Sequence, residues 1–235
     1  MGIHIMPPFY KMVITPPPEE VIVGIYPDAH PESKSVDGSV GQMYASPEED
    51  ETWANIIAAA GVDSSDATTT LEAVSITPSS VANKWHALTR AIILFDTSEL
   101  PDGCVIVEAV LSVYGFRKDD YLSIAPDVNV YSSDPLSNVL LVPGDFDCLG
   151  SIPFCDTPIS YTNWSLAGYN NFILNAAGRE AISKTGVTKL GLRNANYDVA
   201  GSIPAWSDNK YSILFAYAAD KGGDFRPKLT ITYRA

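Results

Sequence analysis

Residues 105–114 read Val-Ile-Val-Glu-Ala-Val-Leu-Ser-Val-Tyr, and this stretch decides the fold class. The odd-numbered side of the stretch is entirely apolar and consists of Val105, Val107, Ala109, Leu111 and Val113. The other side is less apolar and includes a glutamate and a serine. An alternation with a period of two is typical of a β-strand that buries one face. The sequence therefore predicts a strand here, with the apolar set facing the core.

Similar short runs, separated by turn residues, occur along the chain. We expect further strands at residues 21–26, 70–76, 88–95, 127–131, 160–164, 188–192, 211–217 and 228–233. One short helix is predicted between an N-cap at Ser46-Pro47 and a stop at Gly61, and a second over Asn175–Ser183. Asp37-Gly38 is a hairpin signal. Because strands and helices do not alternate, the pattern favours an all-β, antiparallel, jelly-roll-like β-sandwich with two short helices.

The composition is that of a folded domain. The chain has 235 residues, of which 46% are hydrophobic and 18% are charged, and sandwiches of about 200–250 residues commonly form one domain. We expect an extended N-terminal arm at residues 1–20 and a single β-sandwich domain at residues 21–235. The net charge of −13 is opposite in sign to that of a nucleic-acid-binding domain, and no apolar run is long enough to span a membrane. Neither nucleic acid nor a membrane is expected as a partner.

The first 18 residues, MGIHIMPPFYKMVITPPP, contain one lysine, no acid and five prolines. A secretory signal has a basic start and an unbroken apolar stretch, so secretion is not expected. Prolines stiffen and extend such a segment. The apolar side chains that it presents are Ile3, Ile5, Met6, Phe9, Tyr10, Met12, Val13 and Ile14. We expect them to pack either on their own domain, as an edge strand, or on a neighbouring subunit, with Pro16–Pro18 as a spacer.

Three cysteines are too few for a disulfide framework. Cys104 begins an apolar run and is predicted to be buried, whereas Cys148 and Cys155 flank a turn-rich stretch and either form a bridge or stay reduced. Arg90 and Arg193 lie at the ends of apolar strands, where each is expected to form a buried pair with a carboxylate.

Catalytic and metal-binding patterns are weak. His30 and His86 are the candidate bases, without a recognisable nucleophile beside them, and Asp119-Asp120 lies in turn-like sequence where aspartate makes local hydrogen bonds. Calcium would find oxygen ligands in one acidic loop that contains Asp145, Asp147 and Asp156. Solvated loop acids are the commoner case, so we predict no catalytic residue, no cofactor and no metal.

A carbohydrate-binding face needs exposed aromatic platforms. Of the four tryptophans, Trp206 lies in the loop-like sequence Ile-Pro-Ala-Trp-Ser-Asp-Asn and is the candidate glycan platform. The competing interpretation is that each tryptophan plugs an end of the sandwich.

Residues 88–101, Leu-Thr-Arg-Ala-Ile-Ile-Leu-Phe-Asp-Thr-Ser-Glu-Leu-Pro, followed by Val105–Tyr114, resemble the DNRLRE-type β-sandwich family. That family combines a strand ending in Phe-Asp, a Ser-x-Leu-Pro turn and a strand of the form Ala-x-Leu-x-Val-Tyr. Arg226–Tyr233 resembles its closing strand. The resemblance implies a jelly-roll-like sandwich similar to carbohydrate-binding modules. The chain departs from the family at Leu88–Ala91, where the naming motif would lie. It also departs in its N-terminal segment, which does not read as a secretory signal peptide.

The chain is also similar to β-sandwich virion proteins of tailed bacteriophages. The segments that carry this likeness are Tyr26–Glu32, Ser35–Gly38, Arg90–Ser98, Tyr169–Ala176 and Lys184–Arg193. This resemblance implies a structural protein of the phage particle and supplies no catalytic residues.

These observations lead to one functional hypothesis and one alternative. The hypothesis is a non-enzymatic virion protein, either a capsid decoration (cement) protein or a tail- or fibre-associated protein, made in the host cytoplasm. Its partners would be other capsid or tail subunits and further copies of itself in an oligomer or lattice. The alternative is a carbohydrate-binding module of a surface or adhesion protein.

Overall fold

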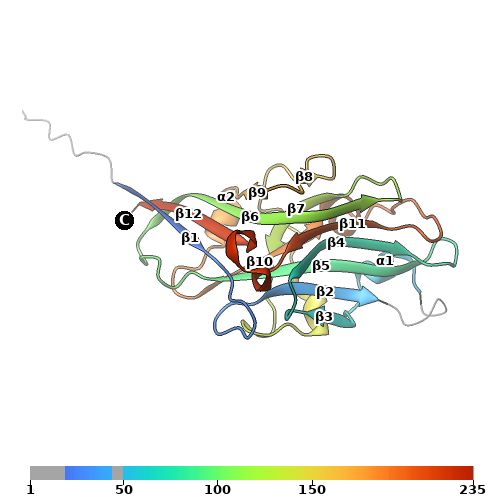
Figure 1. Ribbon diagram of the computed structural model, residues 1–235, viewed down its shortest axis with the longest axis horizontal. Coiled ribbons are helices and arrows are strands. Elements are labelled where there is room, and N and C mark those ends of the chain that lie inside the picture. The colour runs from blue at the N-terminus through green and yellow to red at the C-terminus, as the bar shows by residue number, and fades with distance from the viewer. Residues whose placement is uncertain (1–18, 44–49, 235) are drawn as a thin grey trace, which may run out of the picture.

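A computed structural model describes residues 19–43 and 50–234, which form an all-β antiparallel fold (Figure 1). The strands are β1 (Glu20–Ile25), β2 (Asp37–Met43), β3 (Asp63–Ser65), β4 (Thr70–Pro78), β5 (Trp85–Asp96), β6 (Val105–Asp120), β7 (Asp127–Ser132), β8 (Ile159–Ser160), β9 (Tyr169–Ile173), β10 (Val187–Asn194), β11 (Ser212–Tyr217) and β12 (Lys228–Arg234). The helices are α1 (Trp53–Ile57) and α2 (Ala176–Glu180), with single helical turns η1 (Pro143–Cys148), η2 (Ala195–Val199), η3 (Ala219–Lys221) and η4 (Gly223–Phe225).

One sheet curls around the core. Its strands follow the order β1-β12-β6-β11-β4-β5-β10-β7-β8, with β2 and β3 joined to β5 and with β9 joined to β6. Strand β6 belongs to both halves of the curl, because it pairs with β12 and β9 along its first part and with β11 along its last part. The expected antiparallel sandwich is therefore confirmed. The strand β1 lies at one end of the order and pairs only with β12 among the described strands.

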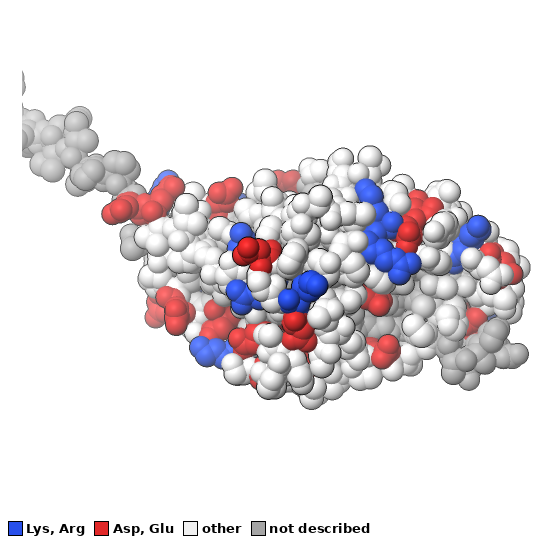
Figure 2. Space-filling model, viewed as in Figure 1, with Lys and Arg blue, Asp and Glu red and all other residues white. Residues whose placement is uncertain are grey.

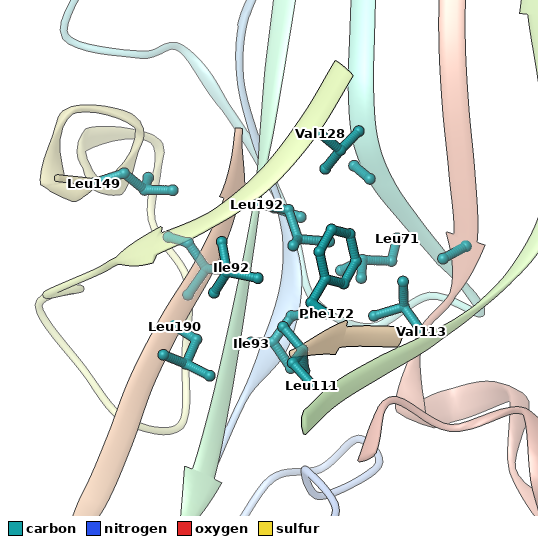
Figure 3. Close-up of a cluster of buried hydrophobic side chains, with 14 of the residues drawn as sticks. Leu71, Ile92, Ile93, Leu111, Val113, Val128, Leu149, Phe172, Leu190 and Leu192 are labelled. Carbon is teal, nitrogen blue, oxygen red and sulfur yellow. The ribbon is translucent and has the colours of Figure 1, made fainter. Parts of the chain in front are cut away.

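The core lies between the two halves of the curled sheet. Figure 3 shows Leu111, Val113 and Phe172 from the β6–β9 side opposite Ile92, Leu190 and Leu192 from the β5–β10 side. All six side chains are almost completely buried. Close packing of this kind is the main favourable contribution to folding.

The strand predicted at residues 105–114 is present as part of β6, but the alternation of buried and exposed side chains changes at a bulge. Thr232 of β12 pairs with Glu108, whereas Tyr233 pairs with Ile106, so Val107 is the extra residue. A bulge reverses the faces on which the residues beyond it lie. Val105, which was predicted to face the core, is consequently 63% exposed, and Ile106 packs against the core instead.

Three other local predictions are wrong. Asp37-Gly38 does not form a hairpin turn but begins β2, which pairs with β5. Residues 161–164 form a turn after the short strand β8 rather than a strand. The first helix begins at Trp53 with Thr52 as its N-cap, and the expected cap at Ser46-Pro47 lies outside the described residues. The second helix is confirmed, since Asn175 accepts a hydrogen bond from the Gly178 amide as its N-cap.

A buried cluster of three charged side chains joins the loops to the centre of the sheet. Arg90 of β5 and Arg193 of β10 each bind Asp198 through Nε and Nη2, at N–O distances of 2.7–2.9 Å. The other N–H groups of the two arginines donate to backbone carbonyl oxygens. Those of Arg90 donate to Ile57 in α1 and Phe146 in η1, and those of Arg193 donate to Leu149 and Gly150 in the following loop. The buried Arg–carboxylate pairs expected for both arginines are confirmed, and they share one aspartate.

The turn η2 places Asp198 between the two arginines. The side chain of Asn194, at the end of β10, accepts hydrogen bonds from the amides of Tyr197 and Asp198. Burial by itself would raise the pKa of Asp198, but hydrogen bonds and charges from Arg193 and Arg90 outweigh this effect and lower the pKa. The cluster therefore carries one negative and two positive charges, with the carbonyl dipoles balancing the excess.

We predict that Asp198→Asn lowers the free energy of unfolding by about 3–5 kcal/mol, because it leaves two buried guanidinium groups without a counter-charge. Urea denaturation measures this change. Asp208→Asn, which removes an exposed carboxylate from a loop, is the control and should change stability by less than about 0.5 kcal/mol. A loss in Asp198→Asn as small as in the control would mean that the carbonyl oxygens alone stabilise both arginines.

Candidate functional site

The eight apolar residues predicted for the arm, from Ile3 to Ile14, lie outside the described residues. The described chain begins at Glu19, one residue before β1, so the arm is attached directly to an edge strand. Val21 and Ile22, at the start of that strand, are 39% and 69% exposed. Apolar surface is thus present on the domain at the point where the arm joins it.

A groove of about 590 Å³ runs beside β1, and we call it the β1 groove. One wall is β1 itself, and the opposite wall is the turn between β5 and β6 together with the loop after β1. Its apolar lining consists of Val23, Ile25, Leu100 and Tyr233, and its charged lining consists of Asp28, Lys34, Asp96 and Glu99. Figure 1 shows β1 and the end of β12 together at one end of the molecule.

Hydrogen bonds hold the charged lining in place. Lys34 Nζ lies 2.7 Å from Asp96 Oδ2, and hydrogen bonds from Lys34 and Ser98 lower the pKa of Asp96 to about 2. Burial raises the pKa of Asp28, but hydrogen bonds from the amides of Lys34, Ser33 and Ser35 outweigh it and lower the pKa overall. Both aspartates are therefore ionised at neutral pH. With Glu99, the groove has three carboxylates and one ammonium group.

Sequence reasoning did not find the β1 groove. Its residues come from three distant parts of the chain, and they share no motif or spacing. Only the pairing of β1 with β12 brings Tyr233 opposite Val21, where both Tyr233 and the nearby Val23 line the groove.

Trp206, the candidate glycan platform, lies in a loop as expected but is partly buried against the core. Its indole Nε1 donates a hydrogen bond of 3.2 Å to the carbonyl of Ser79. This position is that of a residue that closes one end of the sandwich. Of the other tryptophans, Trp53, Trp85 and Trp164 are fully buried.

Aromatic side chains outside the core pack mainly on one another. Tyr114 of β6 contacts Tyr169 and Phe225 edge-on, at centroid distances of 5.5 and 4.9 Å. The hydroxyl of Tyr169 donates to the carbonyls of Asp224 and Arg226, so this cluster fastens η4 to the outer face of the sheet. These rings already have a structural role.

The cysteines and the acidic loop also have structural positions. All three cysteines are free, so Cys148 and Cys155 do not form a bridge, and Cys104 is buried as predicted. Asp145 is buried and accepts hydrogen bonds from the amides of Leu136 and Val142, whereas Asp147 and Asp156 are exposed. Within residues 19–43 and 50–234, no group of three or more His, Cys, Asp or Glu side chains is placed to hold a metal ion.

The candidate bases contact carboxylates. His86 Nδ1 lies 3.0 Å from Asp50 Oδ1, and His30 Nδ1 lies 3.0 Å from Glu32 Oε2. Asp119 binds Arg117, and Asp120 accepts hydrogen bonds from the amides of Ile124 and Ala125. The expected local hydrogen bonds are present at Asp120, but both aspartates lie at the end of β6 and not in a turn.

Comparison of the sequence with protein families and with curated proteins supplies no relative. No protein-family model matches the chain, and a search of curated proteins finds no significant match. Among the helices of the described ranges, none has the length and apolar character needed to cross a membrane. Function must therefore be inferred from the chain's own residues.

Asp37 is a buried carboxyl group, and no cation among residues 19–43 and 50–234 forms an ion pair with it. Both of its oxygens face the amide of Ala219, at 3.0 and 3.3 Å. Burial, with a smaller contribution from the charges of Asp220 and Glu32, raises its pKa to about 8. The folded chain therefore keeps a proton on Asp37 at neutral pH.

We predict that Asp37 makes the protein less stable as the pH rises from about 5 to about 8. The unfolded chain loses this proton near pH 4, so in this range unfolding releases a proton and a higher pH favours it. Asp37→Asn, which keeps a neutral group at the site, should remove this part of the pH dependence and stabilise the protein most at pH 8. Urea denaturation of both proteins at pH 5 and pH 8 tests this, and parallel pH profiles would contradict it.

We also predict that Trp206→Ala lowers the free energy of unfolding by roughly 1–3 kcal/mol, because it removes core contacts and a hydrogen bond. Trp206→Phe should lose less, since it keeps most of the packing. If Trp206 instead serves as a glycan platform, Trp206→Ala will abolish glycan-array binding and leave the thermal unfolding midpoint unchanged.

Proposed function

We propose that the protein is a non-enzymatic structural protein of a bacteriophage particle, a capsid decoration or tail- or fibre-associated protein that attaches to its neighbours partly through residues 1–18. The observation that carries the proposal is the attachment of this apolar segment to the edge strand β1. The particle context is the part of the proposal that rests on the resemblance of residues 90–98 and 184–193 to phage virion proteins.

An edge strand presents backbone N–H and C=O groups that another chain can pair with. Among the described strands, only β12 pairs with β1, so its other edge is available. Strand addition to such an edge is a common mode of protein recognition, in which the backbone supplies affinity and side-chain pockets supply specificity. The neighbouring β1 groove offers such pockets.

The apolar side chains of the segment favour a contact that is extensive. Fully burying one side chain of this size contributes about 1.5–3 kcal/mol, whereas ordering each residue costs about 1–2 kcal/mol. Because association also costs about 4–15 kcal/mol in lost translational and rotational freedom, a contact that buries only one or two of the eight side chains would not hold. Attachment needs most of the set to be buried on a partner surface.

The charge of the domain suits a role on the outside of a particle. The chain has 28 acidic and 15 basic residues, and acidic side chains are spread among the basic ones over the face shown in Figure 2. A net charge far from zero keeps assemblies dispersed through mutual repulsion.

We predict that deletion of residues 1–18 leaves a folded domain that no longer joins its assembly. The buried core residues lie between Val36 and Ile231, so far-ultraviolet circular dichroism and the thermal midpoint should be nearly unchanged. Occupancy on particles that display the full-length protein measures the effect. Full occupancy by the truncated protein would refute attachment through this segment.

A further inference from the structure

We infer that the β1 groove is the acceptor site for residues 6–14, Met-Pro-Pro-Phe-Tyr-Lys-Met-Val-Ile, of a second copy of this chain. The inference rests on the proposed function, because it assumes that the N-terminal segment makes the assembly contact. It adds the location of the acceptor, the residues that recognise the segment and the identity of the partner.

The shape and lining of the groove suit an extended apolar chain. It runs beside a strand whose outer edge is unpaired within the described residues, so an incoming segment can pair with the backbone of β1. The six residues of β1 span about 20 Å, and nine extended residues span about 30 Å, so the donor segment is long enough to follow the whole strand. Val23, Ile25, Leu100 and Tyr233 supply apolar surface within the groove.

Charge complementarity supports the same occupant. The lining contains Asp28, Asp96 and Glu99 against Lys34 alone, so it carries an excess of negative charge. The single charged residue among the first 18 is Lys11, which is positive and lies within residues 6–14. Asp28 and Asp96 are engaged by the backbone and by Lys34, which leaves the exposed Glu99 as the partner for Lys11.

The prolines favour a second copy over the same chain. To lie along its own β1, the segment would have to reverse direction between Ile14 and Glu19, and this stretch reads Thr-Pro-Pro-Pro. Tight hairpins use residues with positive φ, whereas proline holds φ near −65° and has no N–H to donate. Three consecutive prolines favour an extended backbone. The sequence of this stretch therefore favours another molecule, rather than the same chain, as the partner of the segment.

Charge-reversal variants of the full-length chain test the pairing. Lys11→Glu and Glu99→Lys should each raise the dissociation constant for self-association by about tenfold, and the double variant should restore it. Glu180→Lys makes the same charge change at an exposed acid outside the β1 groove and should have no effect. Sedimentation equilibrium measures the constants. No effect of Glu99→Lys, no restoration in the double variant, or a full-length protein that stays monomeric overturns the inference.

A disulfide experiment identifies the occupant. With Tyr10→Cys and Glu99→Cys in one chain, mild oxidation should give cross-linked dimers on non-reducing gels, and neither single variant should do so. A cross-link within one chain overturns the choice of a second copy.

If deletion of residues 1–18 abolishes assembly but Glu99→Lys does not weaken it, the assignment of the β1 groove as the acceptor is wrong while the proposed function stands. If the deletion has no effect, the proposed function fails as well.

Discussion

The shared aspartate between Arg90 and Arg193 is the interaction on which the rest of the structure depends. It connects two central strands with α1, η1 and the loop after η1, none of which those strands reach through sheet pairing. A guanidinium group offers five donors in a fixed plane, and here they reach carbonyls from separate loops as well as one carboxylate. Arginine suits this position because lysine could not make the same planar contacts.

Much of the strand content could be predicted, because the buried face of each strand leaves a period of two in the sequence. Strand β9 was missed since Tyr169–Ile173 contains two asparagines, and one of them, Asn170, is buried by bonding to Ser165 and Val113. The prediction of a hairpin turn at Asp37-Gly38 was wrong because the carboxyl group of Asp37 is buried and accepts a hydrogen bond from the amide of Ala219. In both cases a distant partner satisfies a polar group that local rules place at the surface.

The candidate site was only half predictable, for a similar reason. An apolar segment with one charge is conspicuous in composition, and residues 1–18 identify it without any structure. The acceptor is not conspicuous, because Leu100, Tyr233 and Glu99 are ordinary residues that become a groove only after β1 joins β12. Donor segments are continuous in sequence, whereas acceptor surfaces are assembled by folding.

The proposed association of copies with this charge poses an electrostatic problem, and the division between arm and domain offers a solution. All 28 acidic residues but only 14 of the 15 basic residues lie after residue 18, since Lys11 is the exception. Two such domains repel each other when they come within the Debye length of about 8 Å. A segment whose only charge is positive, and which spans about 40 Å when twelve residues are extended, can reach a neighbour while the acidic bodies stay apart. The proposed contact, which needs extensive apolar burial, therefore uses the one part of the chain that an acidic surface attracts.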